Sequence, residues 1–196
     1  MRPALRNLLF RPRKTTITDF WGGYPDGTLV NGKMTETGGK VWTAGSPYTI
    51  QSGSLDKTPS TGYPIWPSFD SSMPNFAEAS FVLSAVVGTT CYSSFSFRRN
   101  NGNSWSWELA VKPTLIQLNK YNGSWSTAIN IPITQIVGDR IMVSAVEGTV
   151  TIRKNGDILG STTDVFNASL TPVVLALYSN SLSDYMRISQ FRMVGA

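Results

Sequence analysis

The pattern that most constrains the fold begins at Thr15. From there on, short runs rich in Val, Ile, Thr, Tyr, Phe and Trp alternate with clusters of Gly, Asn, Pro and Ser. This alternation is typical of many short β-strands joined by tight turns, and it predicts an all-β fold with no helix in this part. The predicted strands cover residues 15–21, 28–30, 40–43, 48–51, 53–57, 77–87, 91–99, 104–111, 114–120, 125–131, 139–146, 149–154, 157–162, 172–179 and 185–194.

The middle of the chain gives the sharpest local predictions. In CYSSFSFR, residues 91 to 98, the odd-numbered residues fall on one face of a strand and the even-numbered residues on the other, as in a half-buried antiparallel strand. In SWSWELAV, Trp105 and Trp107 share a face, and we assign both to the core. Asn155-Gly156 predicts a two-residue hairpin, because Asn and Gly tolerate the positive φ that such turns require.

The first fourteen residues, MRPALRNLLFRPRK, differ in character from the rest. They carry five of the 17 Lys and Arg residues and none of the 12 acidic ones, so the remaining 12 basic and 12 acidic charges cancel and the net charge of +5 belongs to this segment. We therefore divide the chain into an N-terminal basic and apolar arm, residues 1–14, and one β-sandwich domain, residues 15–196. A neutral domain argues against a broad phosphate-binding face, so nucleic acid is not an expected partner.

The arm has the composition of an anchoring segment. Leu5, Leu8 and Leu9 lie at i, i+3 and i+4, which would place them on one side of a short helical turn. Pro3 and Pro12 limit any helix to about two turns, so the arm is predicted to be extended or partly helical. The residues predicted to bind a partner are Arg2, Leu5, Arg6, Leu8, Leu9, Phe10, Arg11 and Arg13.

Catalytic and metal-binding patterns are scarce in the sequence. The chain contains no His, and its single cysteine, Cys91, is predicted to be a buried free thiol. None of the four Glu residues lies two or four positions along a strand from another acid, the spacing that would put a carboxyl pair on one face, and we expect Glu108 to be solvated. No phosphate-binding glycine loop occurs. The sequence thus predicts a protein that is not an enzyme and has no cofactor or metal.

Residues 58–76, TPSTGYPIWPSFDSSMPNF, form the longest predicted loop. Its prolines break any strand ladder, while its aromatic residues supply a large apolar area. A loop of this length inside a compact domain is usually functional or a contact surface, although the aromatic residues could instead plug an open edge of the sandwich. The residues predicted to contact a glycan or a protein are Tyr63, Trp66 and Phe69.

Two blocks of sequence together resemble concanavalin A-like, laminin-G-like jelly-roll modules of bacteriophage virion structural proteins. The first is ITDFWGGYPDGTLVNGKMTETGGKVWTAGSPYTIQSGSL, residues 17–55. The second runs from FVLSAVV through FSFRRNNGNSWSWEL, RIMVSAVEGTVTIRKNG and VVLALYSN to MRISQFRMV. The resemblance implies an antiparallel two-sheet jelly-roll sandwich over nearly all of residues 15–196.

The resemblance also indicates where catalytic, calcium-binding and sugar-binding sites would lie. Glucanases of this fold carry acidic catalytic residues alternating along one strand, and this sequence has no such cluster. Calcium-binding members use paired acids near the chain ends; Asp19 fits one such position, whereas Ser189 and Gln190 stand where the other acid would be. Sugar-binding members use exposed aromatic side chains, for which the candidates in this chain are Tyr63, Trp66, Tyr121, Trp125 and Tyr178.

Three functions follow as expectations. The first is a non-enzymatic phage virion structural protein, a capsid decoration or cement protein or a head or tail appendage, docked to capsid or tail proteins through residues 1–14. The alternative is a lectin-like, carbohydrate-binding receptor-recognition module of a phage tail, which would bind a cell-surface glycan. The third is an inert domain whose arm binds a membrane surface or nucleic acid.

Location and assembly are predicted on the same basis. Arg6 and Asn7 interrupt the only apolar stretch near the N-terminus, so we expect no signal peptide, synthesis in the host cytoplasm and a final location in the virion. No apolar run approaches the roughly 18 residues that span a bilayer. A homo-oligomer is expected for a module of this kind.

Overall fold

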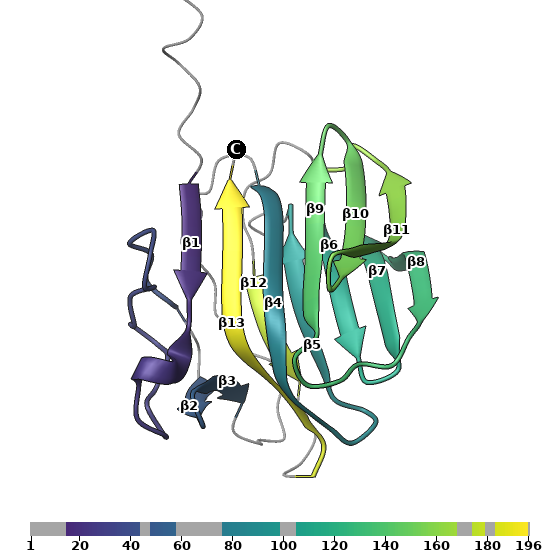
Figure 1. The fold of residues 1–196 in the computed structure, drawn as a ribbon. Helices are drawn as coiled ribbons and strands as arrows, with labels where there is room; N and C mark the ends of the chain where they lie inside the picture. The colour runs from purple at the N-terminus through teal and green to yellow at the C-terminus, as the bar shows by residue number, and fades with distance from the viewer. Residues whose placement is uncertain are drawn as a thin grey trace, which may run out of the picture.

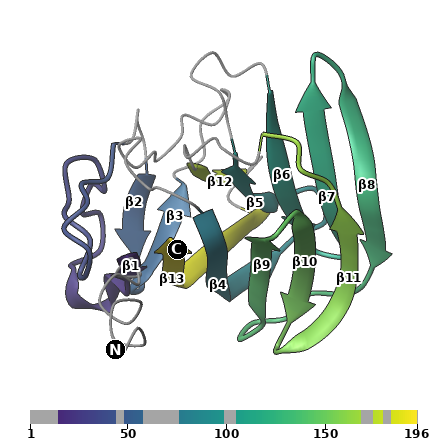
Figure 2. The ribbon, with the colours of Figure 1, turned by 90° about the horizontal axis from the view of Figure 1, so that it is seen from above.

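The computed structural model describes residues 15–43, 48–57, 76–98, 105–167, 174–178 and 183–195. Within these residues the chain forms two antiparallel β-sheets that pack face to face (Figure 1). Seen from above, β4, β9, β10 and β11 lie in one layer and β5, β6, β7 and β8 in the other (Figure 2). The prediction of an all-β, antiparallel, two-sheet jelly-roll sandwich is confirmed.

The larger sheet has eight strands in the described residues. In order across the sheet they are β11 (Asp157–Thr163), β10 (Thr149–Lys154), β9 (Arg140–Val146), β4 (Phe76–Val87), β13 (Tyr185–Gly195), β3 (Ser54–Lys57) and β2 (Tyr48–Gln51), and β1 (Thr15–Asp19) also pairs with β13. The first strand therefore pairs with the last, with Thr15 opposite Gly195 and Asp19 opposite Phe191. This pairing joins the two ends of the described chain in one sheet.

The smaller sheet has five strands in the part of the chain that the structure describes. Their order is β12 (Val174–Tyr178), β5 (Tyr92–Phe97), β6 (Trp105–Lys112), β7 (Leu115–Asn122) and β8 (Trp125–Pro132). Strands β5 to β8 follow one another in sequence and in space, which is the meander that the sequence predicts. Strand β8 lies at the edge of this sheet and is largely exposed.

The core fills the space between the two sheets because each strand turns alternate side chains inward. Its largest fully buried side chains include Trp21, Trp42 and Trp107. Trp107 is 1% exposed, so its predicted core position is confirmed, and the side chain of Trp105 lies outside the described residues. Cys91 is a buried free thiol, as predicted, and burial raises its pKa to about 12.

The region before β2 differs from the sequence prediction. Residues 28–30 and 40–43 do not form strands; they make only isolated bridges, such as Met34 with Val41 and Leu29 with Thr49. The predicted strand 15–21 ends at Asp19, and a short 3-10 helix, η1 (Trp21–Gly23), follows where no helix was expected. Glycines weaken strand formation, and this region is rich in them, so turns replace the predicted ladder.

The Asn155-Gly156 hairpin is confirmed. Both residues have positive φ, 54° and 100°, and the turn joins β10 to β11. The side-chain oxygen of Asn155 also accepts a hydrogen bond from the Arg140 backbone N–H, which ties the hairpin to β9.

Some predictions fall outside the described residues. These are the arm, residues 1–14, with Arg2, Leu5, Arg6, Leu8, Leu9, Phe10, Arg11 and Arg13, and the loop residues Tyr63, Trp66 and Phe69. The division into an arm and a domain stays a prediction. A search of the described residues found no helix long and apolar enough to cross a membrane.

Candidate functional site

The outer face of the five-stranded sheet, which points away from the core, carries many polar side chains. Trp107 points inward, so its neighbours in β6 point outward, and partners across an antiparallel ladder lie on the same face. Following the register from β6 across the sheet defines one set of outward residues. This polar face consists of Tyr92, Ser94, Ser96, Ser106, Glu108, Ala110, Lys112, Leu115, Gln117, Asn119, Tyr121, Trp125, Thr127, Asn130 and Pro132.

Glu108 lies near the centre of the polar face. It stands opposite Ser96 on one side and Asn119 on the other. The Asn119 side-chain N–H donates to Glu108 Oε2 at 3.4 Å, and the Thr127 hydroxyl lies 2.9 Å from Asn119 Oδ1, to which it donates. A hydrogen-bonded row of polar groups thus crosses three strands, from the carboxyl group on β6 to the edge strand β8.

The environment of Glu108 differs from the solvated one that the sequence predicts. Its side chain does lie on the face opposite Trp107, but it is half-buried. Burial raises the pKa of the Glu108 carboxyl group, while hydrogen bonds from Asn119 and Ser94 and the positive charge of Lys112 act in the opposite direction. Glu108 therefore holds its proton to higher pH than an ordinary glutamate.

A second polar row lies beside the first. Lys112 Nζ donates to Gln117 Oε1 at 3.0 Å, and Gln117 Nε2 donates to Asn130 Oδ1 at 2.9 Å. The two amide groups of Gln117 and Asn130 are therefore fixed in orientation by each other and by the lysine.

Small side chains separate these larger groups. Ser94, Ser96, Ser106 and Ala110 are all buried, although they point away from the sandwich core. On the polar face, the hydroxyl and methyl groups of these small residues therefore surround the longer side chains of Glu108 and its amide neighbours.

An aromatic pair flanks the polar rows. Tyr121 and Trp125 are cross-strand partners, and their ring centroids lie 4.9 Å apart. Trp125 is 59% exposed and is the first residue of the edge strand β8. The sequence singled out both residues as sugar-contact candidates, and the structure brings them together; the side chain of Tyr178, the third strand candidate, lies outside the described residues.

The remaining members of this face were missed by sequence reasoning. Gln117 and Asn119 alternate along the strand TLIQLNK, whereas Thr127 and Asn130 lie three positions apart in WSTAINI. Only the register, with its irregularity between Leu118 and Asn119, places all four residues on the face that carries Glu108 and Trp125.

Asp19, the residue that fits one acid position of the calcium-binding members, is the last residue of β1 in the larger sheet. It is buried, and its Oδ2 accepts a hydrogen bond of 2.5 Å from the Trp42 indole, while Oδ1 has no hydrogen-bond partner among the described residues. Gln190 Oε1 accepts a hydrogen bond from Arg140 instead. Among the described residues no group of three or more His, Cys, Asp or Glu side chains could hold a metal ion.

The fold and this face define a concanavalin A-like β-sandwich whose smaller sheet presents a polar and aromatic outer surface. No family model matches the chain, and no curated protein matches it in sequence. Solved structures do match it. A Crh5 transglycosylase in complex with NAG has a TM-score of 0.61 at 17% identity, covering 93% of this chain and 84% of that one.

Two further solved structures illustrate the range of this fold. A β-glucanase from Bacillus licheniformis has a TM-score of 0.57 at 12% identity, covering 91% of this chain and 97% of that one. The carbohydrate-binding module CBM66 from Bacillus subtilis has a TM-score of 0.51 at 13% identity, covering 87% of this chain and 96% of that one. Likeness at these identities establishes the jelly-roll fold.

These matches contradict two of the predictions made from the sequence. The similar structures are carbohydrate enzymes and a carbohydrate-binding module, not virion proteins, so the assignment as a non-enzymatic phage virion structural protein is withdrawn, together with the statement that the chain is not an enzyme. Those predictions relied on the arm and on acid spacing along single strands. Spacing along one strand does not reveal which side chains a sheet brings together across its strands.

Proposed function

We propose that this protein is carbohydrate-active and binds a glycan chain across the polar face of its five-stranded sheet. The observation that carries the proposal is the placement of the pair formed by half-buried Tyr121 and exposed Trp125 beside the hydrogen-bonded row Glu108–Asn119–Thr127 on one surface. The likeness to carbohydrate enzymes and to a carbohydrate-binding module supports it.

The chemistry of the face suits a sugar ring. A pyranose has an apolar side formed by its C–H groups, and this side can lie against the exposed indole ring of Trp125, whereas its hydroxyl groups need donors and acceptors. Amide groups supply both, and those of Gln117 and Asn119 are already fixed by their neighbours. Little side-chain entropy is therefore lost when a glycan binds.

Glu108 is the group to which we assign the role of general acid. A carboxyl group whose pKa is raised by burial can donate its proton to the leaving glycosidic oxygen as the bond to the anomeric carbon breaks, while a water molecule or an acceptor sugar attacks that carbon and releases its own proton to solvent. The Asn119 side chain donates to Glu108 Oε2, and the Ser94 side chain also hydrogen bonds to the carboxyl group. Glu108→Gln keeps the shape of the side chain and removes the acid, so any turnover of a glycan by this face is expected to disappear in that variant.

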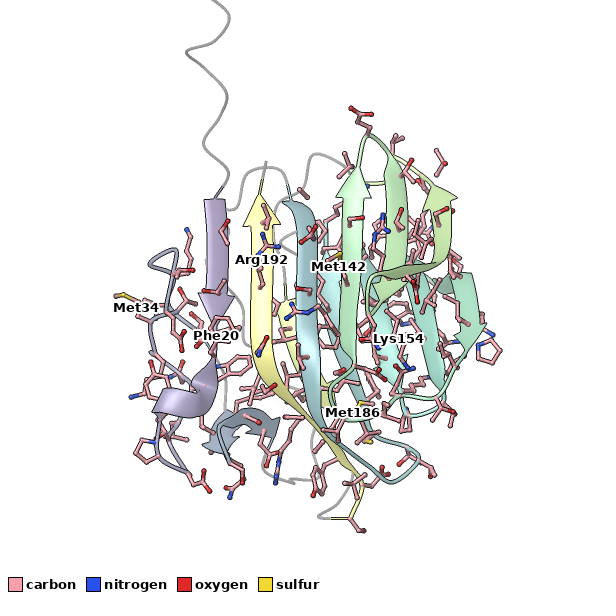
Figure 3. All side chains as sticks on the ribbon, in the orientation of Figure 1. Phe20, Met34, Met142, Lys154, Met186 and Arg192 are labelled. Carbon is pink, nitrogen blue, oxygen red and sulfur yellow. The ribbon has the colours of Figure 1, made fainter. Side chains whose placement is uncertain are left out.

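The test compares glycan binding by the wild type and by Trp125→Ala. In a screen of neutral and charged oligosaccharides, we expect the wild type to bind at least one ligand and Trp125→Ala to bind it about 10-fold more weakly, the loss that one aromatic stacking contact accounts for. Phe20→Ala is the matched control, because Phe20 is also an exposed aromatic residue, 43% exposed, but lies in the segment after β1, away from this sheet (Figure 3).

The outcomes separate clearly. Binding that falls in Trp125→Ala and persists in Phe20→Ala supports the polar face as the site. Absence of binding to every oligosaccharide, or equal binding by both variants, contradicts the proposal. The virion location, the role of the arm and the homo-oligomer stay predictions.

A further inference from the structure

We infer that Lys112 selects glycans that carry an acidic group, a carboxylate or a sulfate, and binds that group at the end of the polar face opposite Trp125. The inference rests on the proposed function, because it assigns the substrate class of the same site. It depends on where Lys112 lies, on how its ammonium group is held and on the charges around it.

Lys112 lies at the far end of the polar face from the aromatic pair. It is the last residue of β6, opposite Leu115 in β7, whereas Tyr121 lies at the other end of β7 opposite Ser106. The six residue-to-residue steps from Leu115 to Tyr121 correspond to about 20 Å of extended strand. A ligand that contacts both ends must be an oligosaccharide, and its acidic unit would lie several units from the one that stacks on Trp125.

The ammonium group of Lys112 is held in place instead of extending into solvent. It donates to Gln117 Oε1, and Gln117 is fixed in turn by its hydrogen bond to Asn130. An ammonium group has three N–H donors, and Gln117 takes one of them. Because the Lys112 side chain is already oriented, binding an acidic group to it costs less side-chain entropy than binding the same group to a mobile surface lysine.

The charges on the polar face favour an anion. The ionisable side chains of the polar face, as its described residues define it, are Tyr92, Glu108, Lys112 and Tyr121. Burial favours the neutral form of Glu108, so the positive charge of Lys112 is only partly balanced by it. Lys112 is half-buried, where a paired charge is screened less by salt than it is on an open surface.

The experiment compares two oligosaccharides of equal length, an oligogalacturonate and the neutral galacto-oligosaccharide. For the wild type we expect the acidic ligand to bind about 10-fold more tightly, the effect of one well-held charge contact. Lys112→Gln should remove that preference for the acidic ligand over the neutral one, and Lys112→Arg should keep the preference because it keeps the charge. A sulfated oligosaccharide forms a second arm that distinguishes sulfate from carboxylate.

Lys33→Gln is the matched control. It changes the net charge of the protein equally, but Lys33 lies in the segment before β2, where its ammonium group sits over the Tyr24 ring. The preference should survive in this variant, and all variants are compared with the wild type by thermal unfolding so that a folding defect is recognised.

The possible results support or overturn the inference separately from the proposed function. Equal binding of acidic and neutral ligands by the wild type, or equal effects of Lys112→Gln and Lys33→Gln, overturns the role of Lys112. If the neutral ligand still binds and Trp125→Ala abolishes that binding, the proposed function stands without this inference. If no ligand binds the wild type, both fail.

Discussion

At the scale of single residues, burial decides the chemistry of the acids in this protein. Glu108 and Asp19 both have a raised pKa, and in each case burial is the largest cause. The sequence could show that Glu108 faces away from Trp107, because alternation fixes faces. It could not show the burial of Asp19 or its hydrogen bond to Trp42, since these depend on a contact between residues 23 positions apart.

Asp19 gives a stability prediction of its own. Burial raises its pKa to about 6, so at pH 7.5 the folded protein holds a buried carboxylate with one unpaired oxygen. Asp19→Asn keeps an acceptor for the Trp42 indole and removes the charge, and we expect it to increase the free energy of unfolding at pH 7.5 by about 2 kcal/mol. Urea denaturation measures the change, and Asp157→Asn, at an exposed hairpin position, is the control. If Asp19→Asn were less stable than the wild type, burial of the Asp19 carboxylate would not be destabilising as we infer.

At the scale of elements, patterns within one strand were predictable and pairings between distant strands were not. The β5–β8 meander and the Asn155-Gly156 hairpin follow from alternation and turn residues over short stretches. The pairing of β1 with β13 joins the two ends of the described chain, and no local pattern encodes it. For the same reason the aromatic candidates Tyr121 and Trp125 could be named from the sequence, whereas the Glu108–Asn119–Thr127 row required the register.

The carboxylate of Asp184 links two elements that are far apart in the sequence. Asp184, just before β13, accepts hydrogen bonds from the backbone N–H groups of Thr90 and Cys91 and from the Thr90 hydroxyl, in the turn between β4 and β5. These bonds lower the pKa of Asp184. Asp184→Ala leaves those donors without their acceptor, and we expect it to cost about 1–3 kcal/mol of unfolding free energy. Guanidinium denaturation measures this loss.

A matched variant separates the hydrogen bonds from the side chain's volume. Asp184→Asn keeps one acceptor oxygen and removes the charge, so we expect it to lie between the wild type and Asp184→Ala in stability. If Asp184→Ala were as stable as the wild type, the hydrogen bonds that Asp184 accepts would not contribute to stability as we infer. Gly88 packs directly against Asp184, so Gly88→Ala should also destabilise this turn.

At the scale of the whole molecule, the perturbed carboxyl groups predict the pH at which the protein is most stable. Asp139, Asp164 and Asp184 have lowered pKa values, so the stability they contribute is present above their ordinary value of 3.8 and is lost as the pH falls below it. Asp19 and Glu108 have raised pKa values, so their contribution is present at low pH and is lost as the pH rises, for Asp19 through about 6.

The two groups of acids together predict a stability maximum close to pH 4, because the lowered pKa values add stability up to about pH 4 and the raised pKa of Asp19 removes stability between its ordinary value of 3.8 and about 6. Urea denaturation at a series of pH values from 3 to 8 should give a free energy of unfolding that rises from pH 3, peaks near pH 4, declines to about pH 6 and then levels off. In Asp19→Asn the decline in the free energy of unfolding above the peak should become smaller. The rise on the acid side should be retained, because the groups with lowered pKa values remain. A wild-type curve that shows no decline between pH 4 and pH 6 would mean that Asp19 is not buried as the structure places it.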